Sequence, residues 1–205
     1  MTIQISLTQF LTFKAFVSTN AKYNYILKQK NNDGYHPSHD YWKNFREAIH
    51  RLPYNNGDLT VLYDAVDMVK PEKKANYTKS VNNFINFVSD NDVTFFEVGK
   101  AKWNFENELV INASPDIGMI IDGKKYFVKV FPNVQQKKSR LDSRSVKSIL
   151  TLLQETNANF NTSSGTFAVL RVNSPRFFKA EAIKERDSKL LKIDAANFVN
   201  CWEAV

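Results

Sequence analysis

An aspartate and a lysine on two adjacent predicted strands are the residues of this sequence best placed to do chemistry. They lie in the segment SPDIGMIIDGKKYFVKVF, residues 114–131, where Asp116 opens the first strand and Lys129 stands within the second. The Asp-Gly pair between the strands is a strong signal for a tight hairpin turn. If Lys129 is buried it needs a partner, and Asp116 on the paired strand would supply one as an ion pair. Alternatively, Asp116 caps a turn, as an aspartate that follows proline commonly does.

Basic residues are concentrated around and after this turn. The chain has 205 residues and a formal net charge of +7, and residues 123–150 contain eight Lys or Arg but one Asp. The eight are Lys124, Lys125, Lys129, Lys137, Lys138, Arg140, Arg144 and Lys147. Positive charge focused in one window predicts a polyanionic partner, and nucleic acid is the leading candidate. The alternative is a solvated helix face, which is the usual fate of a charge run.

The helices and strands around the hairpin follow a regular order. Apolar spacing predicts a helix at 76–90, a strand clearest at 108–113, and hairpin strands at 116–121 and 125–131. A helix at about 140–155 follows, and an apolar strand at 165–172 completes the series. This second helix is predicted to bury Val146, Ile149, Leu150 and Leu153 and to carry Arg140, Arg144, Lys147 and Thr151 as an outer stripe.

This order of elements, with Pro115-Asp116 at the start of the second strand and Lys129 in the third, resembles the PD-(D/E)XK, or restriction-endonuclease-like, superfamily. The resemblance covers roughly residues 76–172 and implies an αβββαβ core of the α/β (α+β) class. Members of that family hydrolyse phosphodiesters with Mg²⁺, which prefers carboxylate oxygens. Carried over, Asp116 would hold the metal, Lys129 would orient the attacking water, and Glu106 or Glu108 would complete the ligand set.

The sequence departs from the family pattern at residue 127, where the family has a second acid and this chain has phenylalanine. A phenyl ring cannot ligate a metal. Asp122 cannot replace the acid, because it lies in the turn, ~17 Å of extended strand away. The helix after the hairpin offers only Asp142 and the distant Glu155. One firm carboxylate is too few to hold Mg²⁺ well, so the resemblance implies a degenerate site.

The first 70 residues are expected to form a helical region, and residues 75–205 the nuclease-like core with a C-terminal strand and helix. Ser6 and Gln9 make a capping-box pattern before the first helix, and Ser38 and Asp58 are the expected caps of two later ones. The stretch 71–74, PEKK, breaks the helical pattern and marks the predicted boundary. At the other end, a short strand around 189–193 and a helix capped by Asp194 finish the chain.

Three histidines near the start of the chain invite a zinc hypothesis, which their spacing disfavours. His39 and His50 are about three turns apart on one predicted helix, or ~16 Å, so they cannot share an ion with His36.

The overall composition is that of a globular domain, with 43% hydrophobic and 24% charged residues. The single cysteine, Cys201, excludes internal disulfides and a cysteine-cluster zinc site. No apolar run is long enough to span a membrane, and the N-terminus lacks the basic head of a secretory signal. We therefore expect a cytoplasmic protein without a membrane partner.

These observations support three hypotheses. The first, which we favour, is a nucleic-acid-binding protein with an inactive nuclease-like core and no cofactor, binding through Lys124, Lys125, Lys137, Lys138, Arg140, Arg144 and Lys147. The second is an active Mg²⁺-dependent nuclease with an atypical ligand set, Asp116 with Glu106 or Glu108. The third is a small interaction or inhibitor module from a mobile element that docks on an acidic protein.

Overall fold

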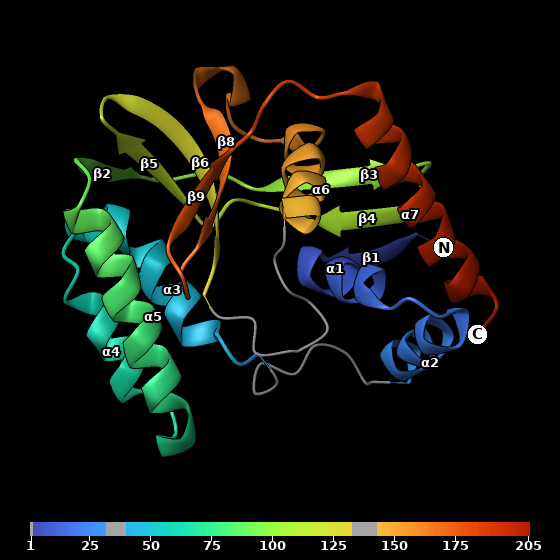
Figure 1. Ribbon diagram of the computed structural model, residues 1–205, viewed down its shortest axis with the longest axis horizontal. Coiled ribbons are helices and arrows are strands. Elements are labelled where there is room, and N and C mark those ends of the chain that lie inside the picture. The colour runs from blue at the N-terminus through green and yellow to red at the C-terminus, as the bar shows by residue number, and fades with distance from the viewer. Residues whose placement is uncertain (1, 32–39, 133–142) are drawn as a thin grey trace.

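Two mixed β-sheets with helices packed around them make up the protein (Figure 1). The structure, a computed structural model, describes residues 2–31, 40–132 and 143–205. The helices are α1 (Leu7–Ala15), α2 (Thr19–Lys30), α3 (Lys43–Arg51), α4 (Val61–Asp67), α5 (Pro71–Ser89), α6 (Ser143–Gln154) and α7 (Glu185–Glu203), with short 3₁₀ turns at Leu52–Asn55 and Thr162–Ser164. The protein therefore belongs to the mixed α+β class, as the sequence predicts.

The larger sheet has five strands in the order β2-β5-β6-β8-β9. Their bounds are β2 (Val93–Phe96), β5 (Ile117–Ile121), β6 (Lys124–Phe131), β8 (Thr166–Arg171) and β9 (Arg176–Lys179). Strands β2, β5 and β6 form an antiparallel meander, β8 runs parallel to β6, and β9 is antiparallel to β8. A parallel neighbour requires a crossover, and α6 provides it between β6 and β8.

The first strand of this sheet differs from the predicted one. Residues 108–113 were expected there, but the sheet uses β2, Val93–Phe96. Residues 109–112 instead form β4, which pairs with β3 (Ala101–Phe105) in the four-stranded sheet β1-β4-β3-β7. The apolar pattern of a strand does not specify which sheet it joins, because that depends on its partners.

The N-terminal region is not entirely helical, because it opens with β1 (Ile3–Ser6). This strand runs parallel to β4, with Ile3 opposite Leu109 and Ile5 opposite Ile111, and β7 (Asn157–Ala158) lies at the other edge. The predicted capping box is present at the end of β1, where the Ser6 side chain accepts from the Gln9 backbone. Only four residues alternate between apolar and polar before the capped helix, and this pattern is too short to predict a strand from the sequence.

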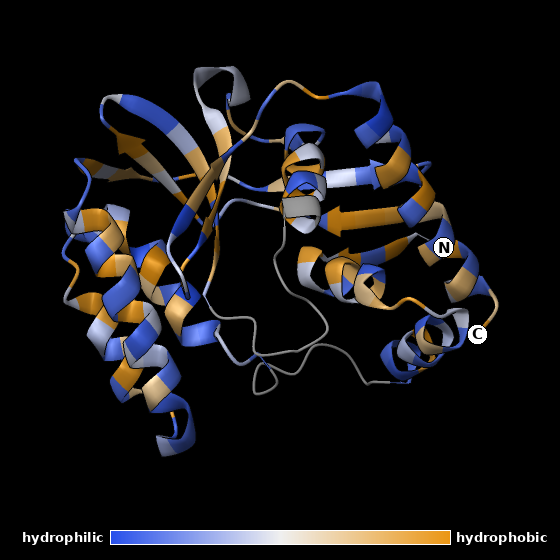
Figure 2. Ribbon diagram, viewed as in Figure 1, coloured by the Kyte–Doolittle hydropathy of each residue, from blue (hydrophilic) through white to orange (hydrophobic). Residues whose placement is uncertain are grey.

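Two apolar cores lie on opposite faces of the five-stranded sheet. Alternate residues of β6 serve each core: Phe127 joins one, and Val128 and Val130 join the other. In Figure 1, α3, α4 and α5 cover one face, while α6 stands between the other face and the group formed by α1, α2 and α7. Figure 2 shows β4 as hydrophobic. The outer helices carry both hydrophobic and hydrophilic residues, as expected for helices that are covered on one side.

The predicted boundary at 71–74 is the beginning of α5, with Pro71 in its first turn. Proline is favoured there because its missing N–H would have no helical partner. Both cores contain residues from before and after this point, such as Phe10 with Phe198 in one and Phe45 with Phe84 in the other. The helices before residue 70 are therefore packed into the same two cores as the rest of the chain.

The C-terminal strand expected around 189–193 is part of the helix α7, which runs from Glu185 to Glu203. Leu191, Ala195 and Phe198 are buried at helical spacing, whereas Leu190 and Ile193 are exposed. Residues 189–193 resemble a strand only when their pattern is considered without the residues that follow. Within the described segments, no helix is long and apolar enough to cross a membrane.

The packing of the N-terminal helices on α7 predicts the effect of a core truncation. Phe13 is 1% exposed, and its ring meets the Phe198 ring edge-on with centroids 4.9 Å apart. Phe13→Ala should lower the free energy of unfolding by about 3–5 kcal/mol, measured by urea denaturation. Val17→Ala, at a side chain that is 99% exposed, is the control and should change it by less than about 0.5 kcal/mol. An unchanged midpoint for Phe13→Ala would contradict the shared core.

Candidate functional site

Asp116 and Lys129 form an ion pair that joins the start of β5 to the end of β6. Lys129 Nζ donates to Asp116 Oδ1 over 2.8 Å and to the Ser114 carbonyl over 2.9 Å. The second carboxylate oxygen, Oδ2, accepts from the Val130 backbone N–H at 2.8 Å. The Asp116 side chain is 4% exposed and the Lys129 side chain 18%. Both oxygens of the carboxylate are thus engaged in holding the two strands, in agreement with the ion-pair alternative.

Phe127 occupies the position of the missing second acid and is packed among three other aromatic rings. Its side chain is 2% exposed and lies across from Gly118 in the β5–β6 pairing. Ring centroids of Phe96, Phe160 and Phe167 lie 6.1, 4.8 and 5.4 Å away. A carboxylate placed here would be surrounded by apolar rings and would lose its hydration. Position 127 therefore serves packing in this chain.

A pocket of about 340 Å³ opens beside Asp116. Three segments line it: the end of α3 and its 3₁₀ turn, the connection from β2 to β3, and the connection from β4 to β5. Their lining residues are His50, Pro53 and Tyr54, then Phe96, Glu97, Val98, Gly99 and Lys100, then Ser114, Pro115, Asp116 and Ile117. Both connections pass from one sheet to the other, so the pocket lies at the junction of the sheets.

The wall made by the β2–β3 connection is held in place by Asn159. The Lys100 backbone N–H donates to Asn159 Oδ1 over 2.7 Å, and the Asn159 N–H donates to the Lys100 carbonyl over 3.0 Å. A Cβ atom at Gly99 would lie 2.0 Å from Asn159 Oδ1, so this close approach requires glycine. The wall is therefore preformed and does not depend on a ligand for its shape.

Two titratable groups in the pocket are perturbed. Partial burial lowers the pKa of His50 below its ordinary 6.5; nearby Asp116 and Glu47 raise it, and Lys129 and Arg46 lower it further. The imidazole is consequently neutral at pH 7. The second perturbed group is Tyr54. Its hydroxyl hydrogen-bonds with Glu97, and this contact raises the pKa of the exposed tyrosine.

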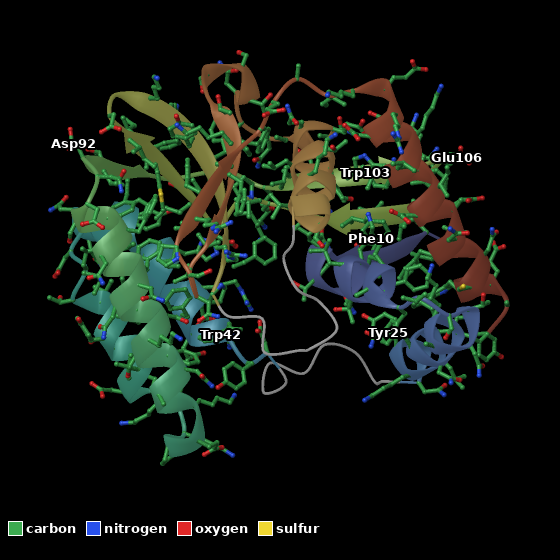
Figure 3. All side chains as sticks on the ribbon, viewed as in Figure 1. Phe10, Tyr25, Trp42, Asp92, Trp103 and Glu106 are labelled. Carbon is green, nitrogen blue, oxygen red and sulfur yellow. The ribbon has the colours of Figure 1, made fainter. Side chains whose placement is uncertain are left out.

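The carboxylates predicted to join Asp116 lie elsewhere. Glu106 and Asn107 form the turn between β3 and β4, with φ of 48° and 60°. Glu106 lines a second pocket with Trp103, Asn104, Phe105, Glu155 and Lys192, on the side of the molecule near α7 (Figure 3). Glu108 precedes β4, whose whole length separates it from the connection that contains Asp116.

Among the described residues, no group of three or more His, Cys, Asp or Glu side chains could hold a metal ion.

The described lysines of the basic window on β6 are spread along the strand. Lys124 and Lys125 begin β6 and Lys129 stands near its end; the eight residues of the strand extend over ~23 Å. Lys125 remains connected to the pocket, because its Nζ lies 4.6 Å from the centroid of the Phe96 ring. Lys124 is exposed at the turn.

The polar stripe predicted for the outer face of α6 is only partly exposed to solvent. Lys147 pairs with Asp187 of α7 over 2.9 Å, and Thr151 is 4% exposed. The reason is that α7 covers α6 on a side that the sequence pattern left polar. The four predicted inner residues, Val146, Ile149, Leu150 and Leu153, are buried. Lys137, Lys138, Arg140 and the side chain of Arg144 lie outside the described residues.

Several pocket residues were not among those predicted. His50, Tyr54, Glu97 and Lys100 come from a helix end, a turn and a connection that are distant from Asp116 in the sequence. No spacing relates them, and His50 stood out only as one of three histidines. Their proximity follows from the pairing of β2 with β5, which brings residues 96–100 beside residues 114–117.

Comparisons with known proteins add little to this geometry. No protein-family model matches the sequence, and no curated protein matches it. Among solved structures, one described as "Crystal structure of SSO0001" is similar, with 9% sequence identity and a TM-score of 0.33, over 95% of this chain and 85% of that one. A TM-score of this size supports no argument about function.

The ion pair predicts a large loss of stability when one partner is removed. Asp116→Ala would leave the Lys129 ammonium and the Val130 N–H without an acceptor, and should lower the free energy of unfolding by about 3–5 kcal/mol. Asp67→Ala removes a carboxylate that is 82% exposed and 3.7 Å from Lys74, and should cost less than about 1 kcal/mol. The double substitution Asp116→Ala/Lys129→Met should recover part of the loss. Equal denaturation midpoints for Asp116→Ala and Asp67→Ala would refute the role of the pair.

His50 reports on the charges around it. Its folded-state pKa is lowered, so the unfolded chain binds more protons near pH 6 and stability should fall as the pH drops through 6.5. By NMR titration, Asp116→Asn should lower the His50 pKa further, and Lys129→Met should raise it. His50→Gln should flatten the change in urea midpoint between pH 7.5 and pH 5.5. Shifts of the same sign in the two variants would show that the ring does not lie between these charges.

Proposed function

We propose that the protein binds nucleic acid at the pocket beside Asp116 and through the adjoining basic segment 137–147, on a nuclease-like core that lacks catalysis. The observation that carries the proposal is the arrangement of the five-stranded sheet. Along the chain, α5, β2, β5, β6, α6 and β8 succeed one another with β3 and β4 inserted after β2 and β7 inserted after α6; β2, β5 and β6 form an antiparallel meander, and β8 is parallel to β6. This arrangement supports the PD-(D/E)XK resemblance, in which Asp116 stands directly before the second strand and Lys129 within the third.

The charge distribution supports a polyanion at this end of the sheet. The basic segment follows β6 in the sequence, after the end of the strand where Lys129 pairs with Asp116, and contains Lys137, Lys138, Arg140, Arg144 and Lys147 against the single acid Asp142. Lys100 lines the pocket, and Lys125 packs on the Phe96 ring in its wall. Basic side chains around a concave site raise the local concentration of a polyanion and its rate of association.

The same geometry favours binding without hydrolysis. Both Asp116 oxygens already accept hydrogen bonds, and the position of the second acid holds the buried Phe127. A hard divalent cation needs several oxygen ligands, and the predicted partners Glu106 and Glu108 lie away from the pocket. Cleavage of plasmid or single-stranded DNA with Mg²⁺ or Mn²⁺ that Asp116→Ala abolishes would favour the nuclease alternative.

Fluorescence anisotropy with labelled DNA and RNA at increasing salt tests the proposal. The affinity should fall steeply with salt, and about five phosphate contacts would give a log–log slope near −4 to −5 on duplex DNA. The triple substitution Lys137→Glu/Lys138→Glu/Arg140→Glu should weaken binding by at least about tenfold, because it reverses three charges that would contact phosphates.

The matched control carries the same change in charge on exposed residues outside the basic window, Lys28→Glu/Lys70→Glu/Lys79→Glu. It should retain most of the affinity at 150 mM salt, where long-range charge effects are screened. Absence of binding to any nucleic acid at low salt would refute the proposal. Co-purification of an acidic protein in the absence of nucleic acid would favour an interaction module instead.

A further inference from the structure

The lining of the Asp116 pocket suits a small planar ligand. It combines two aromatic side chains, Tyr54 and Phe96, with the apolar side chains of Pro53, Val98, Pro115 and Ile117. Tyr54 lines the pocket and is 64% exposed, so much of its side chain is accessible to a ligand. Pockets of about 300 Å³ and above with apolar walls and a few polar groups are typical of small-molecule sites.

The carboxylates of the pocket disfavour an anion beside them. Asp116 and Glu97 are both carboxylates, and partial burial keeps His50 neutral at pH 7. Asp116 is 4% exposed and each of its oxygens accepts a hydrogen bond, whereas Glu97 is exposed and has the Tyr54 hydroxyl as its hydrogen-bond partner. A carboxylate has about four acceptor positions, so Glu97 can accept further N–H donors from a ligand.

One lysine lines the pocket and a second packs against its wall. Lys100 is exposed on the β2–β3 connection, and the Lys125 ammonium lies 4.6 Å from the Phe96 ring centroid. This combination of acceptors and lysines is complementary to a nucleotide whose base meets the acceptors and whose phosphates meet the lysines. Exocyclic amino groups of bases donate to carboxylates, as cytosine N4 does to Glu or Asp.

We propose that this pocket takes one unstacked nucleobase that carries an exocyclic amino group, with Tyr54 stacking on it and Glu97 accepting from it. The inference rests on the proposed nucleic-acid binding and specifies its substrate class. Bases in a duplex are paired and stacked, and extruding one costs a few kcal/mol. The protein therefore prefers single strands to duplex, and cytosine to thymine or uracil.

The test compares labelled 20-nucleotide strands of dC and dT, the corresponding C and U RNAs, and a mixed-sequence duplex, all at one low salt concentration. Wild type should bind dC more tightly than dT and either DNA strand more tightly than the duplex, and the RNA pair should show whether the ribose changes this order. Tyr54→Ala should weaken binding to dC by at least about fivefold, the value of one stacked base, and leave duplex binding unchanged.

Tyr63→Ala is the matched control, because Tyr63 is a 46% exposed tyrosine on α4 that does not line the pocket. It should leave all affinities unchanged. Glu97→Gln should reduce the preference for dC over dT, because an amide can also donate to thymine O4. Both pocket variants change exposed side chains, and unchanged urea midpoints would establish that they fold.

The outcomes separate this inference from the proposed function. If wild type binds duplex as tightly as single strands and Tyr54→Ala changes neither, the base pocket is refuted while nucleic-acid binding stands. If wild type binds none of the five probes, both proposals fail. A selective loss of single-strand affinity in Tyr54→Ala, with Tyr63→Ala unaffected, supports both.

Discussion

The ion pair between Asp116 and Lys129 fixes the point at which the two sheets meet. Lys129 also binds the Ser114 carbonyl, and Asp116 binds the Val130 N–H, so both the β4–β5 connection and the end of β6 are held by one buried carboxylate and one lysine. Partly buried charges of this kind are tolerated only when each finds its partners, which makes the geometry around them specific. The pocket opens beside this junction, and the β2–β3 and β4–β5 connections, which both pass between the sheets, line it.

At position 127 this chain has a side chain that stabilises the core and cannot ligate a metal. Its ring packs among Phe96, Phe160 and Phe167 and joins β6 to the core beneath it. An acid in its place would gain a ligand for a cation but would lose the burial of a large aromatic side chain, and it would need compensation for its own desolvation. Each Asp116 oxygen accepts a hydrogen bond from β6, and the pocket beside it combines the carboxylate of Glu97, the aromatic side chains of Tyr54 and Phe96, and Lys100.

Described residues of the basic window that are near in the sequence are not all near in space. Lys124 and Lys129 lie toward opposite ends of β6, and Lys147 of α6 is paired with Asp187 of α7. Lys100, which lies outside the basic window of the sequence, is instead brought to the pocket. The net positive charge still attracts polyanions at long range, but the close contacts depend on which of these side chains share a surface.

Local patterns determined the parts of the fold that involve near neighbours in the chain. The Asp-Gly hairpin, the Ser6–Gln9 capping box and the buried face of α6 are all present as the sequence predicts, because turn preference, capping and helical spacing act over a few residues. The sheet membership of β4, the strand at the N-terminus and the grouping of Tyr54 and Glu97 with Asp116 were decided by tertiary structure. Each depends on pairing between segments many residues apart, and strand pairing is specified by the partner and the core that covers it, which no local pattern records.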